Sequence, residues 1–381
     1  MRTRFMTMTM AALLLLLSAS FACAAGTIKI GGLFSVTGPP AFLGEPERNT
    51  AKMVVDQINK AGGIKGQKLE LIVYDTAGDA TKAVQMATKL IRDDKVVAII
   101  GPSTTGETMA VIQIAERERV PLISCAAGSR ITDPVKRYVF KTAQNDGLAV
   151  SKIYEHLQQQ KINRVAILTV SDGFGSSGRE QLKLLAAKYG IQLLVDDTYG
   201  PKDTDMTAQL TKIRGSQAQA LIVWGTNPGP AVIARNAKQL GLKLPLYMSH
   251  GVSSKKFIAL AGDTAEGVKL PSGKVIVADA LPKKDPQKVA LLSFVKDYQN
   301  HYRQEGDHFG GHAWDAVMLL KGVIEQGSAT TAEAIRSGLE TTRSFHGIGG
   351  TFTYSSRDHA GLTKDAFVMV EIRNADWILA K

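Results

Sequence analysis

Cysteine is scarce in this chain, which has only Cys23 and Cys125 among 381 residues. Cys23 lies in an N-terminal segment with the pattern of a secretory signal. The exported chain would therefore keep Cys125 alone and form no intramolecular disulfide, even in an oxidising compartment. Its fold must rest on buried apolar side chains, which a hydrophobic content of 44% allows. For Cys125, which follows a predicted strand, a buried small hydrophobe is favoured over a nucleophile.

Several catalytic and membrane signatures are missing as well. After residue 25 no stretch approaches the ~18 consecutive apolar residues that span a membrane. Neither Gly-x-Ser-x-Gly nor His-Glu-x-x-His occurs, and the glycine-rich loop 171–178, SDGFGSSG, lacks the lysine of a GxxxxGK[ST] phosphate loop. Aromatic residues make up 6%, and the lysines behind the net charge of +11 are spread along the chain without a dense cluster. We expect no enzyme, no cofactor and no nucleic-acid partner.

The N-terminus has the three parts of a secretory signal peptide. Arg2 and Arg4 precede an apolar block, 10–17, and small residues follow at 18–25. This order predicts that residues 1–25 are a cleaved signal peptide and that the mature chain is periplasmic. Cys23 raises the alternative of a lipoprotein, but Ser20 stands where that motif prefers leucine.

Short apolar runs alternate with amphipathic helical stretches along most of the chain. In residues 80–92, for example, the apolar positions recur on one helix face. The predicted strands are residues 28–34, 69–74, 96–100, 120–124, 165–170, 191–195, 220–224 and 244–248. This rhythm is typical of parallel sheets with crossover helices, and it occurs twice, which predicts two doubly wound α/β lobes.

Hydroxyl side chains follow one of these strands. In IIGPSTTGETMAVIQIAERE, residues 99–118, Thr104 and Glu107 have the spacing of a capping box before an apolar helix face. Ser103 and Thr105 would then lie beside free backbone N–H groups at a helix N-terminus, where a carboxylate is favoured. The spacing alone leaves open whether these hydroxyls bind an anion or only cap the helix.

Four stretches resemble a known family: INKAGGIKGQKLELIVYDTAGD (58–79), VVAIIGPSTTGET (96–108), PLISCAAGS (121–129) and AGDTAEGV (261–268). They are similar to the branched-chain-amino-acid-type (Leu/Ile/Val-binding-protein-like) solute-binding proteins of ABC transporters. The resemblance implies a type I periplasmic binding fold, with two parallel-sheet lobes joined by a three-strand hinge. We assign residues 26–144 and 277–355 to lobe 1, and residues 145–276 and 356–381 to lobe 2.

The resemblance also implies how lobe 1 would hold a ligand. In amino-acid binders of this family, hydroxyl and N–H groups after the third and fourth strands bind the ligand carboxylate. The matching positions here are Ser103 and Thr105, then Ala126, Ala127 and Gly128.

In lobe 2 the match is incomplete. Phe174 stands where the family has an aromatic residue that covers the ligand, and Thr226 stands where it has a tyrosine. His250 occupies the place of the acid that binds the α-ammonium group. A histidine cannot replace that acid, because two charges about 4 Å apart attract by roughly 4 kcal/mol at an effective dielectric of 20.

We therefore expect a ligand with a carboxylate and an aromatic or aliphatic body, but without an α-ammonium group. Phe42, Phe174 and Trp224 are candidates to line that body, although Trp224 also fits a core position. Asp205 or another acid of lobe 2 could still reach an ammonium group, so amino acids remain the alternative.

The sequence thus predicts the periplasmic substrate-binding component of an ABC importer, a monomer that passes a small organic acid to a membrane permease. The alternatives are a receptor for branched-chain or other amino acids and a ligand-sensing module for a separate signalling partner. A metal site is disfavoured: His308 and His312 have i, i+4 spacing, but Gly310 and Gly311 between them should weaken a helix.

Overall fold

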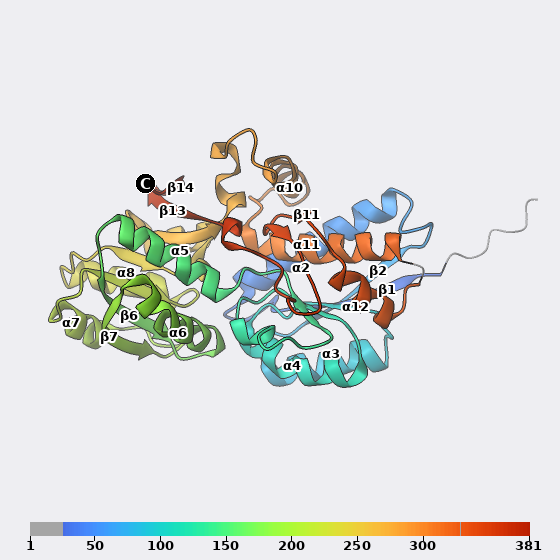
Figure 1. Ribbon diagram of the computed structural model, residues 1–381, viewed down its shortest axis with the longest axis horizontal. Helices are drawn as coiled ribbons and strands as arrows, with labels where there is room; N and C mark the ends of the chain where they lie inside the picture. The colour runs from blue at the N-terminus through green and yellow to red at the C-terminus, as the bar shows by residue number, and fades with distance from the viewer. Residues whose placement is uncertain (1–25, 328) are drawn as a thin grey trace, which may run out of the picture.

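The computed structural model describes residues 26–327 and 329–381, so the predicted signal segment lies outside it. Two lobes lie side by side along the long axis of the molecule, each around its own β-sheet (Figure 1). Within these residues, none of the helices combines the length and the apolar character needed to cross a membrane.

The first lobe contains a five-stranded, all-parallel sheet in the order β2-β1-β3-β4-β5. Its strands are β1 (Ile28–Phe34), β2 (Leu69–Asp75), β3 (Ile99–Ile100), β4 (Leu122–Ser124) and β5 (Val139–Lys141). Its helices are α2 (Ala41–Lys60), α3 (Ala80–Arg92), α4 (Thr105–Glu118), α10 (Lys288–Tyr302), α11 (His308–Gln326) and α12 (Ala332–Glu340). The short strands β11 (Phe345–His346) and β12 (Thr351–Phe352) form a separate pair.

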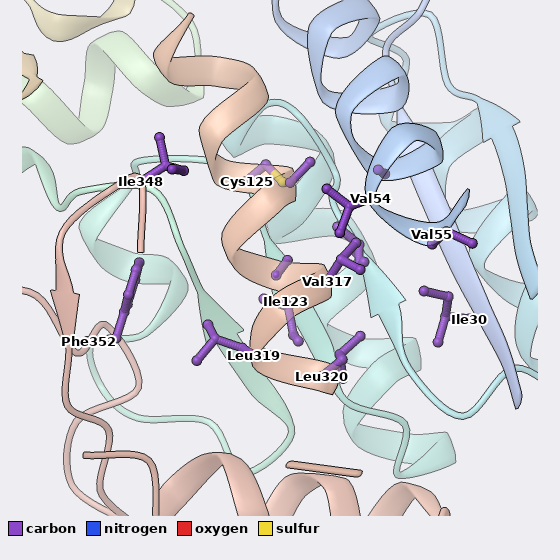
Figure 2. Close-up of a cluster of buried hydrophobic side chains, with 14 of the residues drawn as sticks. Ile30, Val54, Val55, Ile123, Cys125, Val317, Leu319, Leu320, Ile348 and Phe352 are labelled. Carbon is purple, nitrogen blue, oxygen red and sulfur yellow. The ribbon is translucent and has the colours of Figure 1, made fainter. Parts of the chain in front are cut away.

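Both faces of this sheet are covered, which explains why most residues of its strands are apolar. Ile28 and Ile30 of β1 pack against α2 and α11, whereas Leu33 packs against α3 and α4. Figure 2 shows the first of these layers, with Cys125 lying between the side chains of α2, α11 and the sheet. Cys125 is a free, buried thiol whose pKa is raised by burial, as expected for a small core hydrophobe.

The second lobe contains a seven-stranded sheet in the order β14-β13-β10-β9-β8-β6-β7. Its strands are β6 (Arg164–Val170), β7 (Gln192–Tyr199), β8 (Ala220–Trp224), β9 (Leu246–Met248), β10 (Lys269–Gly273), β13 (Phe367–Arg373) and β14 (Asp376–Leu379). Its helices are α5 (Asp146–Gln159), α6 (Gly173–Ala186), α7 (Thr207–Arg214), α8 (Gly229–Gln239) and α9 (Lys255–Ala261). The strands pair in parallel except at β10–β13 and β13–β14.

The predicted α/β class with two parallel sheets is confirmed. The chain passes between the two sheets after β5, after β10 and before β13. The residue limits of the lobes and the hinge role of these passages stay predictions.

The expected weakness of the HFGGH segment is wrong. Helix α11 begins at His308 and includes both glycines in its first turns. A Cβ at Gly310 would lie 2.6 Å from the hydroxyl of Thr50 on α2, and one at Gly311 would lie 2.5 Å from Ile348. The glycines are therefore required for close packing, and that packing outweighs their low helix propensity.

Candidate ligand-binding site

A cavity of about 360 Å³ lies between the two lobes. Its walls come from the loops that follow strands β1 to β9 and from the first turns of α11. Open α/β sheets bind ligands beyond the carboxyl ends of their strands, which is where these loops lie. The volume is at the low end of the roughly 300–1,000 Å³ of small-molecule pockets.

Thr105 lines this cavity and has a buried hydroxyl without a hydrogen-bond partner among the described residues. The predicted cap is present one residue earlier, where the Thr104 hydroxyl accepts the N–H of Glu107 at 3.3 Å. Thr105 begins α4, is 5% exposed and lines the cavity, and its Oγ1 has no hydrogen-bond partner among the described residues. Because buried hydroxyls are nearly always paired, this atom is suited to a ligand oxygen.

Ser103 lines the same wall, but its hydroxyl is already paired. It accepts the N–H of Ser35 at 3.0 Å and donates to the buried carboxyl of Glu47. Burial raises the pKa of Glu47 well above its usual value, and nearby Glu107 raises it further while the Ser103 bond lowers it. The structure therefore places Ser103 within an internal polar network behind the wall.

Of the three residues after β4 that were predicted to bind the ligand, two line the cavity and one does not. Ala126 and Ala127 line the cavity, and the carbonyl of Ala127 accepts a hydrogen bond from the buried ammonium group of Lys141. Gly128 does not line the cavity, because it packs against Thr105: a Cβ there would lie 2.4 Å from Thr105 Cγ2.

On lobe 2, Phe174, Thr226 and His250 all line the cavity, as the family pattern predicts. The ring of Phe174 lies 5.4 Å from that of His250 and 5.8 Å from that of Trp224, measured between centroids. Phe174 thus forms an apolar part of the cavity wall, and its ring packs against the rings of Trp224 and His250.

The loop that carries Phe174 spells G-x-G-x-x-G at residues 173–178, the spacing of dinucleotide-binding turns. Packing within lobe 2 accounts for two of its glycines. A Cβ at Gly175 would lie 1.7 Å from the carbonyl oxygen of Val170, and one at Gly178 would lie 2.1 Å from Trp224 Nε1. These positions need glycine regardless of any phosphate.

His250 is a neutral, buried residue of the cavity wall. It begins a short 3-10 helix, η3 (His250–Val252), directly after β9, and is 3% exposed. Burial lowers its pKa well below the usual value, and His308 and Lys141 lower it further. Its Nε2 lies 3.7 Å from Asp146 Oδ1, but an uncharged imidazole makes no ion pair there.

Three other candidates do not line the cavity. Phe42 lies outside the cavity: it lines a separate groove and packs edge-on against Phe309 with ring centroids 5.8 Å apart. Trp224 is a fully buried core residue. Asp205 is exposed and accepts hydrogen bonds from Thr207, away from the cavity.

Seven polar side chains that line the cavity were not among the predicted site residues. These are Thr104, Glu107, Asp172, Tyr199, Asn227, His308 and His312. Their signal was weak, because each lies beside a feature with an ordinary structural explanation, such as the helix cap that Asp172 supplies to Gly175 N–H at 2.8 Å.

The two lobes touch at one side of the cavity. The N–H of Ser129 donates to Ser177 Oγ at 3.0 Å, and Arg130 Nε lies 2.9 Å from Glu180 Oε2. The Arg130 side chain is 70% exposed, so its charge is directed to Glu180 and solvent rather than to a ligand.

Two α/β lobes that enclose a cavity lined by loops from both define a solute-binding protein. A family model described as "Periplasmic binding protein" matches residues 27–376, and the chain belongs to this family. It is 30% identical to the leucine-, isoleucine-, valine-, threonine- and alanine-binding protein of Pseudomonas aeruginosa, over 84% of each chain. It is 28% identical to the Leu/Ile/Val-binding protein BraC3 of Rhizobium johnstonii, over 89% of this chain and 90% of that one.

Solved structures of binding proteins have the same fold as this chain. An extracellular ligand-binding receptor from Rhodopseudomonas palustris HaA2 superposes with a TM-score of 0.86 at 27% identity, covering 93% of this chain and 99% of that chain. The branched-chain amino acid binding protein LivJ from Streptococcus pneumoniae, in complex with isoleucine, has a TM-score of 0.82 at 25% identity, covering 92% and 97%.

The predicted family and fold are therefore confirmed. On the ligand, the names of the relatives favour the amino-acid alternative over the organic acid that the sequence suggested.

Proposed function

We propose that this chain is the solute receptor of an ABC importer, and that its ligand is a small carboxylic acid with an apolar body. The observation that carries the proposal is the free hydroxyl of Thr105. It belongs to the first turn of α4, in a residue that lines the cavity between the lobes, where the positive end of the helix dipole favours an anion. Phe174 and Phe309 provide apolar wall for the rest of the ligand.

Branched-chain amino acids are the first candidates within this class. The relatives' names support them, and so does Asp172, an acid of lobe 2 that lines the cavity. Burial raises the pKa of Asp172, while the backbone N–H of Gly175 lowers it. An ammonium group beside this carboxyl would favour its charged form.

Carboxylic acids without an ammonium group are the second candidates, and His250 favours them. A neutral imidazole stands at the position where the family has its acid, and the other acid on the cavity wall, Glu107, already accepts from the hydroxyls of Ser35 and Thr104. On this reading Asp172 only caps α6.

Calorimetry with matched ligands separates the two candidates. Leucine and valine are compared with their deaminated counterparts, 4-methylpentanoate and 3-methylbutanoate, on the native protein and on Asp172→Asn. Asparagine caps helices as well as aspartate does, so α6 keeps its cap. Tighter binding of the amino acids, lost in the variant, supports the first candidates. Tighter binding of the deaminated acids in both proteins supports the second. If no carboxylic acid binds, the proposed ligand class is wrong.

The transport role has its own test. Deletion of the coding region should abolish uptake of the identified ligand by the cell, because the permease then receives none. Normal uptake together with a lost cellular response to the ligand would indicate a sensor instead.

A further inference from the structure

We infer that His250, His308 and His312 form a hydrogen-bonding face of the cavity that binds an uncharged hydroxyl group of the ligand. The inference rests on the proposed function, in which the ligand is a carboxylic acid held at Thr105. It adds a second polar group to that ligand and so narrows its chemical class to hydroxylated acids.

Both lobes contribute to this face. His250 follows β9 in lobe 2, whereas His308 and His312 lie in the first turns of α11 in lobe 1. The ring centroids of His250 and His308 are 6.5 Å apart, and those of His308 and His312 are 4.7 Å apart. All three residues line the cavity and are at most 3% exposed. The three rings therefore stand side by side at one wall.

Their ring nitrogens are unpaired within the described part of the chain. Both nitrogens of His250, both of His308, and Nδ1 of His312 have no hydrogen-bond partner there. Buried polar atoms rarely lack a hydrogen-bond partner. Because all three residues line one cavity wall, a group that enters the cavity can reach the ring nitrogens that face it and supply the missing partner.

Two other buried histidines of the same chain provide an internal comparison. In His156, Nδ1 bonds the hydroxyl of Tyr247 at 2.9 Å and Nε2 bonds the carbonyl of Lys381 at 3.1 Å. In His359, Nδ1 bonds the carbonyl of Val139 at 2.9 Å, and Nε2 lies 3.3 Å from a Glu340 carboxylate oxygen. Histidines that serve the fold are thus fully paired here, and those that line the cavity are not.

The chemistry of the face selects the ligand group. Burial lowers the pKa of all three imidazoles, so each is neutral at pH 7 and offers one N–H donor and one lone pair. A hydroxyl also has one donor and acceptor lone pairs, so it can satisfy two rings at once. The three neutral rings themselves supply no counter-charge for a second carboxylate or an ammonium group.

A metal ion fits less well. Across residues 26–327 and 329–381, no group of three or more His, Cys, Asp or Glu side chains has an arrangement that could hold one. Phenylalanine rings border the histidines instead: Phe174 lies 5.4 Å from His250, and Phe309 lies 4.6 Å from His308. A hydroxyl on an apolar body matches such a mixed wall.

The test uses ligand pairs in which one member has a hydroxyl that the other lacks. Threonine has it in place of a methyl group of valine, and tyrosine and 3-(4-hydroxyphenyl)propionate have it in place of a ring hydrogen of phenylalanine and 3-phenylpropionate. Calorimetry on the full mature chain should show a preference for the hydroxylated member of at least one pair by about tenfold or more. His308→Phe should erase that preference, and the readout is the ratio of the affinities for the two members of a pair rather than the affinity for either one. His301→Phe, at an exposed position of α10, is the matched control and should behave as the native protein does.

The outcomes separate this inference from the proposed function. If plain members bind and every hydroxylated partner binds no better, the histidine face does not recognise a hydroxyl, while the carboxylic-acid receptor stands. If no member of any pair binds, both fail. The native protein alone decides between these results, so the conclusion does not depend on whether His308→Phe folds.

Discussion

Replacement of Thr105 by valine tests most directly where the ligand carboxylate lies. Valine has nearly the same shape as threonine but lacks the hydroxyl that lines the cavity. A hydroxyl that donates to a carboxylate contributes roughly 1.5–3 kcal/mol, and each 1.4 kcal/mol is a tenfold change, so binding should weaken by about 10- to 150-fold.

The empty protein should behave differently. Because Thr105 Oγ1 has no partner among the described residues, its removal breaks no hydrogen bond of the fold. We expect the free energy of unfolding of the ligand-free variant to stay within about 0.5 kcal/mol of the native value, or to rise slightly as a buried polar atom is lost.

Two measurements check these expectations: calorimetry with the identified acid, and urea unfolding without it. Thr81→Val, at an exposed position of α3, is the control for the same chemical change. If Thr105→Val binds the acid with native affinity, or if it loses stability and keeps affinity, the carboxylate lies elsewhere and the reasoning fails.

Three further results should follow. Ser103→Ala should lower the free energy of unfolding by about 1–3 kcal/mol in urea titrations, because its hydroxyl serves two buried partners, and should weaken binding less than Thr105→Val does. The pKa of His308 is lowered to about 3 by burial, so below pH 6.5 the unfolded chain binds the extra proton and stability is lost as the pH falls. In urea titrations, the free energy of unfolding of the native protein should therefore fall by about 2 kcal/mol from pH 7 to pH 5, relative to that of His308→Gln. If the difference in free energy between the two proteins is the same at both pH values, the imidazole of His308 takes up its proton in the folded protein as readily as in the unfolded chain. Gly178→Ala should lower the melting temperature through overpacking of roughly 1–3 kcal/mol, whereas Gly215→Ala, where the nearest atom to a Cβ is 3.6 Å away, should not.

Local features of this protein were predictable from the sequence, and pairings across the fold were not. The cap at Thr104 depends on residues three positions apart, so its spacing was sufficient to predict it. The state of the Ser103 hydroxyl depends on Glu47, 56 residues earlier, and no pattern in the chain shows that the two side chains meet.

The same distinction explains the histidines. His250 was a recognisable candidate because it stands at a family position. His308 and His312 were considered only as a metal pair, because spacing describes their common helix face and says nothing of a third ring from another lobe. Phe42 was placed in the site for its aromatic character, and its partner Phe309 is over 260 positions away in the chain.

The place where the lobes meet has a consequence for how tightly any ligand is held. Gly106 and Gly173, in the first turns of α4 and α6, approach so closely that a Cβ on Gly173 would lie 3.1 Å from the backbone nitrogen of Gly106. A methyl group there would crowd this arrangement of the lobes and would not crowd one in which they lie further apart. Since apparent affinity equals intrinsic affinity multiplied by the fraction of molecules in the binding-competent arrangement, a larger residue at this contact would change affinity without altering any polar group that lines the cavity. Receptors with the same binding groups can thus serve different solute concentrations through the size of one residue at this contact.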